Sequence, residues 1–112
     1  MKRELTIIWT TDSKTTTERM VFTYAHNSMK RGWWDRVTVV IWGASAKLAA
    51  EDEAVRTRIR EMSADGVVFE ACKACADQLG VSDALIALGV DVRYWGQSLT
   101  EVLQSGSPVI TV

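Results

Sequence analysis

Residues 67–80 read VVFEACKACADQLG and predict a strand followed directly by a short helix. The apolar run 67–71 is typical of a buried strand, and Gly80 closes the helix that follows Cys72. Cys72 therefore stands near the positive end of the helix dipole, where the field favours a thiolate over a thiol. In a doubly wound sheet, ligand crevices also open at this kind of junction. Cys72 is thus the first candidate for a reactive residue.

Strands and helices alternate along the whole chain. Apolar and β-branched runs predict strands at residues 5–9, 37–42, 67–71, 90–95 and 109–112. The expected helices run from the capping box of Thr15 and Glu18 to Gly32, over 46–64, 73–80 and 82–88, and from the capping box at Ser98 to residue 104. This alternation predicts one α/β domain over residues 1–112, a three-layer α/β/α architecture with a mostly parallel five-stranded sheet.

Composition excludes several classes of function. The 112 residues carry a net charge of -1, and the pI is about 5.8. We therefore expect no nucleic-acid partner, which would need a basic surface. No segment approaches the roughly 20 apolar residues that cross a bilayer, and the first apolar run is too short for a signal peptide, so we expect no membrane partner and a cytoplasmic protein. In a reducing compartment the Cys-x-x-Cys spacing suggests thiol chemistry before a structural disulfide.

Aromatic residues end three of the predicted strands, and a glycine follows two of them. The carboxyl ends of parallel strands meet at one edge of a sheet, which would bring these residues beside Cys72. Trp and Tyr can wall a pocket, glycine lets backbone approach a ligand, and a lysine adds positive potential. Alternatively, the tryptophans cap the core or bury an oligomer interface. The candidate pocket residues are Trp9, Thr10, Asp12, Trp42, Gly43, Lys73, Tyr94, Trp95 and Gly96.

A second thiol, Cys75, lies one helical turn after Cys72. It can act as a resolving thiol, or it can pack on the inner face of the helix between two alanines. One Cys-x-x-Cys and the single histidine, His26, fall short of the usual four zinc ligands, so no metal site is expected. We interpret His26 as a surface or interface residue.

The polar loop at residues 10–17 precedes a helix. Its hydroxyls and Lys14 can hold a phosphate or a sulfur oxyanion at the helix N-terminus. The loop lacks the glycines of phosphate-binding motifs, and its other interpretation is a polar connector with good helix caps.

From residue 67 onward, the chain resembles the DsrE/DsrF-like family, which includes the TusD-type sulfur-relay subunits. The resemblance is carried by GVVFEAC at 66–72, by Gly80-Val81 and Gly89-Val90, and by Gly106 ahead of the terminal VITV. It implies a small α/β/α subunit that assembles into trimers or hexamers. It also implies that the cysteine after the third strand carries sulfur as a persulfide. Cys72 matches that position, whereas Cys75 matches no relay residue.

These observations support one main hypothesis. The chain is a sulfur carrier or sulfurtransferase-type subunit that uses Cys72, needs no cofactor, and works with sulfur donor and acceptor proteins. A vicinal thiol at Cys75 could attack the persulfide and release sulfide, so a Cys72–Cys75 redox protein is the first alternative. The others are a noncatalytic module that binds a nucleotide, a flavin or an anion at the 10–17 loop, and one subunit of a hetero-oligomer that requires a paralogue.

Overall fold

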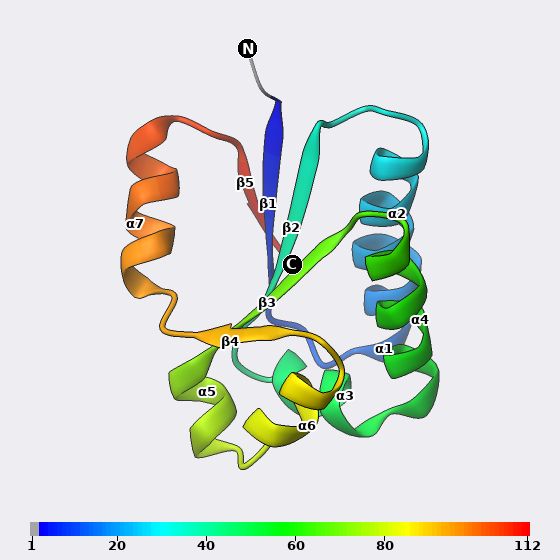
Figure 1. Cartoon of the computed structure of the whole chain (residues 1–112), viewed down its shortest axis with the longest axis vertical. Helices are drawn as coiled ribbons and strands as arrows, with labels where there is room; N and C mark the ends of the chain where they lie inside the picture. The colour runs from blue at the N-terminus through cyan, green and yellow to red at the C-terminus, as the bar shows by residue number, and fades with distance from the viewer. Residues whose placement is uncertain (1–2) are drawn as a thin grey trace.

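A five-stranded sheet forms the centre of the computed structural model, which describes residues 3–112 (Figure 1). The strands lie in the order β4-β3-β2-β1-β5, and every neighbouring pair is parallel. Their bounds are β1 Glu4–Trp9, β2 Arg36–Ile41, β3 Val68–Cys72, β4 Asp91–Arg93 and β5 Val109–Thr111. The predicted α/β fold with a five-stranded sheet is confirmed, and the sheet is wholly parallel.

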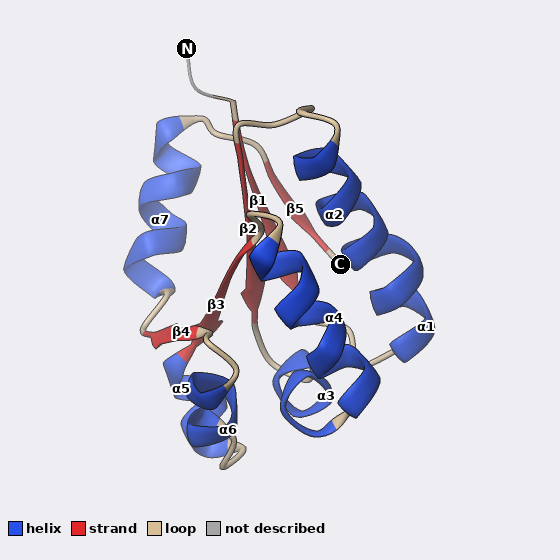
Figure 2. Ribbon diagram, turned by 45° about the vertical axis from the view of Figure 1, so that its right-hand side comes forward, coloured by secondary structure: helices blue, strands red, loops and turns tan. Residues whose placement is uncertain are grey.

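Helices flank the sheet on both faces. One face carries α4 and a continuous helical segment made of α1, η1 and α2, while α7 lies alone on the other face (Figures 1 and 2). The remaining short helices gather beyond the carboxyl ends of the strands. The bounds are α1 Lys14–Thr16, the π-helical η1 Thr17–Phe22, α2 Thr23–Lys30, α3 Ser45–Glu51, α4 Glu53–Ala64, α5 Lys73–Gln78, α6 Ser82–Ala87 and α7 Gly96–Ser105.

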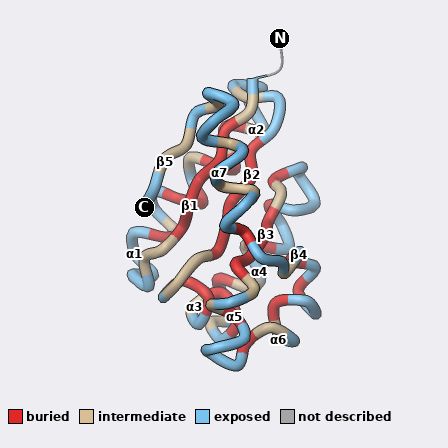
Figure 3. Tube along the Cα trace, turned by 90° about the vertical axis from the view of Figure 1, so that its left-hand side faces the viewer, coloured by how far each residue is buried: buried red, intermediate tan, exposed pale blue. Residues whose placement is uncertain are grey.

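The two faces of the sheet are unequally buried. Alternate residues of β1, β2 and β3 pack against α2 and α4 and form the main core, in which Ile7, Val39 and Phe69 are typical members. A smaller cluster of Ile8, Val40 and Trp95 forms under α7. No residue of α7 is buried, and Figure 3 shows this helix in the colours of exposed and intermediate residues. The α7 face is therefore incompletely covered.

The first helix differs from its prediction at both start and interior. Ser13, not Thr15, is the N-cap, and its Oγ accepts a 3.1 Å hydrogen bond from the Thr16 amide. The segment then winds as a π-helix through residues 17–22. There the buried Thr17 Oγ1 accepts a 3.0 Å hydrogen bond from Trp9 Nε1. This tertiary contact has no signature in local sequence spacing.

The single helix predicted at 46–64 is wrong, because Asp52 divides it into α3 and α4. Asp52 has an extended backbone (φ −84°, ψ 118°), and its Oδ1 accepts a 3.0 Å hydrogen bond from the Val55 amide. An Asp that caps its own downstream amides favours a new helix start over continuation.

The strand predicted at 90–95 is too long, because β4 ends at Arg93. Its partner β3 ends at Cys72, which pairs with Arg93 in the last register position. Tyr94 and Trp95 therefore have no strand to pair with, and α7 begins at Gly96. Ser98 lies inside this helix and accepts a 2.7 Å hydrogen bond from Arg93 Nη1 instead of capping it.

A candidate thiol site at the carboxyl edge of the sheet

Cys72 is both the last residue of β3 and the N-cap of α5. Its backbone is extended (φ −69°, ψ 113°), and β3 is paired with a strand on each side. The residue is 6% exposed, and its side chain makes no capping hydrogen bond. The strand pairing thus holds a nearly buried sulfur in a defined position at the carboxyl edge.

Cys75 is the neighbour of this sulfur. Both cysteines are free, and Cys75 is the more exposed of the two. Burial raises the pKa of the Cys75 thiol, an amide hydrogen bond from Gly43 opposes that rise, and the contact with Cys72 adds to it. Cys75 is therefore mainly a protonated thiol at neutral pH, able to donate a hydrogen bond toward Cys72.

Gly43 supplies that amide from the turn after β2. Its φ of 72° lies in the left-handed region, which glycine adopts without strain. Of the predicted pocket residues, Gly43 is thus brought to the thiol pair through its backbone.

Lys73 does not supply an uncompensated positive charge to Cys72. Its Nζ lies 2.7 Å from Asp77 Oδ2 and 5.7 Å from the centre of the exposed Tyr94 ring. The hydrogen bond with Asp77 raises the pKa of Lys73, and the same bond lowers the pKa of Asp77. The lysine charge is therefore balanced one helical turn beyond the cysteine.

The predicted tryptophans do not form one pocket. Trp9 is fully buried on the α2 face and packs edge-on against Phe22, with ring centroids 5.2 Å apart. Trp42 and the buried Trp95 belong to the small cluster under α7, and Gly96 is exposed at the start of that helix. The sheet itself separates Trp9 from the other two.

Four hydroxyls of the 10–17 loop, those of Thr10, Thr11, Ser13 and Thr17, form hydrogen bonds within the protein. Thr10 Oγ1 donates to the Val112 carbonyl over 3.0 Å, and Thr11 Oγ1 accepts from the Ser13 amide over 3.1 Å. Lys14 pairs with Asp52 at 3.3 Å. These contacts support the connector interpretation of the loop. Asp12 is exposed beside a cavity of about 520 Å³ between this loop and α3.

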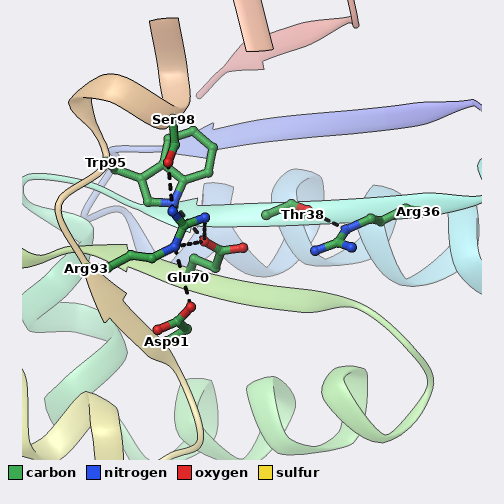
Figure 4. Close-up of polar contacts among 7 residues, drawn as sticks. All are labelled: Arg36, Thr38, Glu70, Asp91, Arg93, Trp95 and Ser98. Atoms are coloured by element: carbon green, nitrogen blue, oxygen red, sulfur yellow. Dashed lines mark hydrogen bonds and ion pairs between the residues drawn. The ribbon is translucent and has the colours of Figure 1, made fainter. Parts of the chain in front are cut away.

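Glu70 is the polar residue that the sequence analysis missed. Its Oε1 accepts hydrogen bonds from Arg93 Nε over 2.7 Å and from Trp95 Nε1 over 2.9 Å (Figure 4). It lies two residues before Cys72, so both side chains point to the α7 face of β3. The available signal is a lone carboxylate inside the otherwise apolar run 67–71.

His26 is buried, at 9% exposure, so the first of its two interpretations, a surface residue, is wrong. Its Nε2 lies 2.7 Å from Asp65 Oδ2, a contact that ties α2 to the end of α4. Within residues 3–112, no three His, Cys, Asp or Glu side chains gather as metal ligands. In the same range, every helix is too short or too polar to cross a bilayer.

Comparison with known proteins gives one family and a consistent fold. The model of the DsrE/DsrF-like family matches residues 4–112. A conserved protein of unknown function from Bacteroides thetaiotaomicron is 45% identical, with a TM-score of 0.95 over 97% of this chain and 94% of that one. Among curated proteins, no sequence matches significantly.

Two more distant solved structures share the fold alone. A protein of unknown function from Methanobacterium thermoautotrophicum is 20% identical with a TM-score of 0.79, and the ychN protein of E. coli is 15% identical with a TM-score of 0.71. In both comparisons each chain is covered over 100% of its length.

Proposed function

This chain belongs to the DsrE/DsrF-like family, and on that premise we propose that it is a sulfur carrier, which accepts sulfane sulfur as a persulfide on Cys72. The observation that carries the proposal is the position of this cysteine, at the end of a strand paired on both sides and at the start of α5. A persulfide carrier needs a positioned thiolate and neither a metal nor a general-base triad.

The proposed transfer balances without an added oxidant or reductant. The Cys72 thiolate attacks the outer sulfur of a donor persulfide, a new S–S bond forms at Cys72, and the donor leaves as a thiolate. An acceptor thiolate then attacks the terminal sulfur, and Cys72 is released as a thiolate. The low exposure of Cys72, 6%, limits the access of oxidants to the resting thiol.

The contact between the two cysteines favours one alternative, a thiol–disulfide redox protein. In that reaction the Cys75 thiolate attacks the inner sulfur of a Cys72 persulfide, a disulfide forms, and hydrosulfide leaves. The raised pKa of Cys75 opposes this attack at neutral pH, because the thiolate is the nucleophile. Because Cys75 stays protonated near neutral pH and attacks slowly, its raised pKa supports the carrier function over the redox function.

The proposal includes an assembly and its partners. We propose a cytoplasmic homo-oligomer, a trimer or a hexamer, that exchanges sulfur with donor and acceptor proteins. The exposed side chains of Tyr94, Ile86 and Leu103, which are 69%, 57% and 59% exposed, are compatible with such contacts.

Intact mass spectrometry after incubation with a persulfide donor tests the carrier function. We expect a one-sulfur adduct on the wild type, retained in Cys75→Ser and lost in Cys72→Ser. A wild type that forms only a Cys72–Cys75 disulfide would favour the redox function. A wild type that remains unmodified would refute both, because neither thiol would then react.

A further inference from the structure

A polar groove of about 420 Å³ lies on the α7 face of the sheet. Its floor is made by Thr6 of β1, Thr38 of β2 and Glu70 of β3, and neither cysteine lines it. Central parallel strands are normally apolar on both faces, because helices cover both. Here α7 covers the part of the face that holds Ile8 and Val40 and also forms one wall of the groove, and the floor residues are 6–8% exposed.

Glu70 has one carboxylate oxygen without a donor. Its side chain is 8% exposed, and Arg93 and Trp95 both bond to Oε1. No described residue donates to Oε2, which points away from that pair and toward Thr38 and Arg36 in Figure 4. Ser28 Oγ is the only fully enclosed polar side-chain atom without a partner in residues 3–112, so Oε2 remains accessible from the groove. A largely buried acceptor without a donor carries a free-energy cost, and a ligand that donates a hydrogen bond to Oε2 would remove that cost.

Arg36 contributes the complementary charge. It begins β2, and its Nε donates a 3.4 Å hydrogen bond to Thr38 Oγ1. Its guanidinium turns toward Glu70 along the same face (Figure 4). Glu4 is its register partner on β1, yet no carboxylate of residues 3–112 lies within ion-pair distance of Arg36.

The charges of the groove decide the class of ligand. Glu4, Glu70 and Glu101 line the groove together with Arg36 and Arg93, and Arg93 is already paired with Glu70 and Asp91. A simple anion on Arg36 would meet the carboxylates, and a simple cation on Glu70 would meet Arg36. A molecule with both charges satisfies both ends.

We propose that this groove binds a small zwitterion of the amino-acid type, with its ammonium on Glu70 Oε2 and its carboxylate on the Arg36 guanidinium. The hydroxyl-bearing Thr38 lies between the two charges (Figure 4), and Thr6 of the neighbouring β1 adds a second hydroxyl to the groove lining. The volume falls within the range of about 300–1,000 Å³ that is usual for small-molecule sites. The site is independent of the proposed sulfur chemistry and stands or falls without it.

The test is a titration of the ¹⁵N-labelled full chain, followed at the indole N–H signal of Trp95, which reports on Glu70. The probes are glycine, β-alanine, γ-aminobutyrate and 5-aminovalerate, which carry the same two charges at increasing separation. We expect a saturable shift for at least one of them, with a Kd on the order of 1 mM. n-Butylamine and butyrate each carry one of the charges and should bind at least about tenfold more weakly than the best probe.

Variants then assign the two ends. Arg36→Gln should weaken the best zwitterion at least about tenfold and leave n-butylamine no weaker. Glu70→Gln should weaken both, and Lys30→Gln, which removes an exposed charge from α2, should change neither. The proposal is overturned if no probe gives a saturable shift, if butyrate or n-butylamine binds as tightly as the best zwitterion, or if Arg36→Gln has no effect. If Glu70→Gln fails to fold, two results still test the proposal. They are the comparison of zwitterionic with singly charged probes on the wild type, and the affinities of the Arg36→Gln variant, which changes an exposed residue.

Discussion

Trp95 Nε1 donates a 2.9 Å hydrogen bond to Glu70 Oε1, which joins the start of α7 to a central strand. Arg93 strengthens the same junction, because it bonds both to Glu70 and, over 2.7 Å, to Ser98 in the first turn of α7. Since α7 has no buried residue of its own, this network and the small cluster around Trp95 hold the helix on the sheet.

We expect Trp95→Phe to destabilise the fold by about 1–3 kcal/mol. The substitution keeps a ring in the cluster but removes one donor from a buried carboxylate, and an unmet buried hydrogen bond costs about that much. Urea unfolding followed by circular dichroism measures the change.

Trp33→Phe is the matched control, because Trp33 is 47% exposed and outside both buried clusters. Its effect should stay within about 0.5 kcal/mol. Equal losses in the two variants would contradict the role given to the Trp95 hydrogen bond.

Thr17→Val should also cost about 1–3 kcal/mol, because it leaves the buried Nε1 of Trp9 without its acceptor while keeping the side-chain shape. Urea unfolding again gives the free-energy change, with the exposed Thr15→Val as the control. If both variants unfold alike, the Trp9–Thr17 bond contributes nothing measurable.

Asp52 should make the stability depend on pH in the acid range. The hydrogen bond from Val55 and the neighbouring Lys14 hold the pKa of Asp52 below its usual value in the folded state. A lowered folded pKa means that the stabilisation is complete above the unfolded value of about 3.9 and is lost as the pH falls through the folded value. Wild type should therefore have a higher melting temperature than Asp52→Ala at neutral pH, and this difference should shrink below about pH 4.

The control for Asp52 is Glu53→Ala, which removes an exposed carboxylate from the next position without removing the N-cap. Because Glu53 is 82% exposed and its ion pair with Arg60 is long, at 3.9 Å, its loss should lower the melting temperature less than Asp52→Ala does at neutral pH. A difference between wild type and Asp52→Ala that stays constant through the acid range would show that the cap does not depend on ionisation.

The pKa of the Cys75 thiol should lie above that of an ordinary cysteine. In the Cys72→Ser variant, its alkylation rate by iodoacetamide should rise with pH to a midpoint higher than that of the same variant unfolded in urea, because burial is the main cause of the raised pKa. A midpoint equal to that of the unfolded chain would remove the physical reason to prefer the carrier over the redox function.

The raised pKa of Cys75 also makes sulfide release depend on pH in wild-type protein that carries a persulfide on Cys72. Release should accelerate as the pH rises, because more Cys75 becomes thiolate. Cys75→Ser should retain its sulfur at every pH tested. Equal release from both proteins would exclude attack by Cys75.

Local patterns predicted the order of the elements. The alternating apolar runs placed all five strands, and glycines such as Gly80 marked where helices stop. Cys72 at a strand–helix junction was also predicted, because that position depends on the boundary between two adjacent segments. The errors at Ser13, Asp52 and β4 are errors of boundary, where side-chain caps and the length of a partner strand override the local pattern.

By itself, the sequence determined the α/β alternation, the family and the position of Cys72 along the chain. Only the tertiary structure decided which side chains share a face of the sheet. It placed Trp9 in the core and formed the hydrogen bond between Trp95 and Glu70. It also brought Glu70 and Arg36 into the lining of one groove. The physical reason is that hydrophobic periodicity encodes local burial, whereas a hydrogen bond between residues 25 positions apart depends on strand order and register.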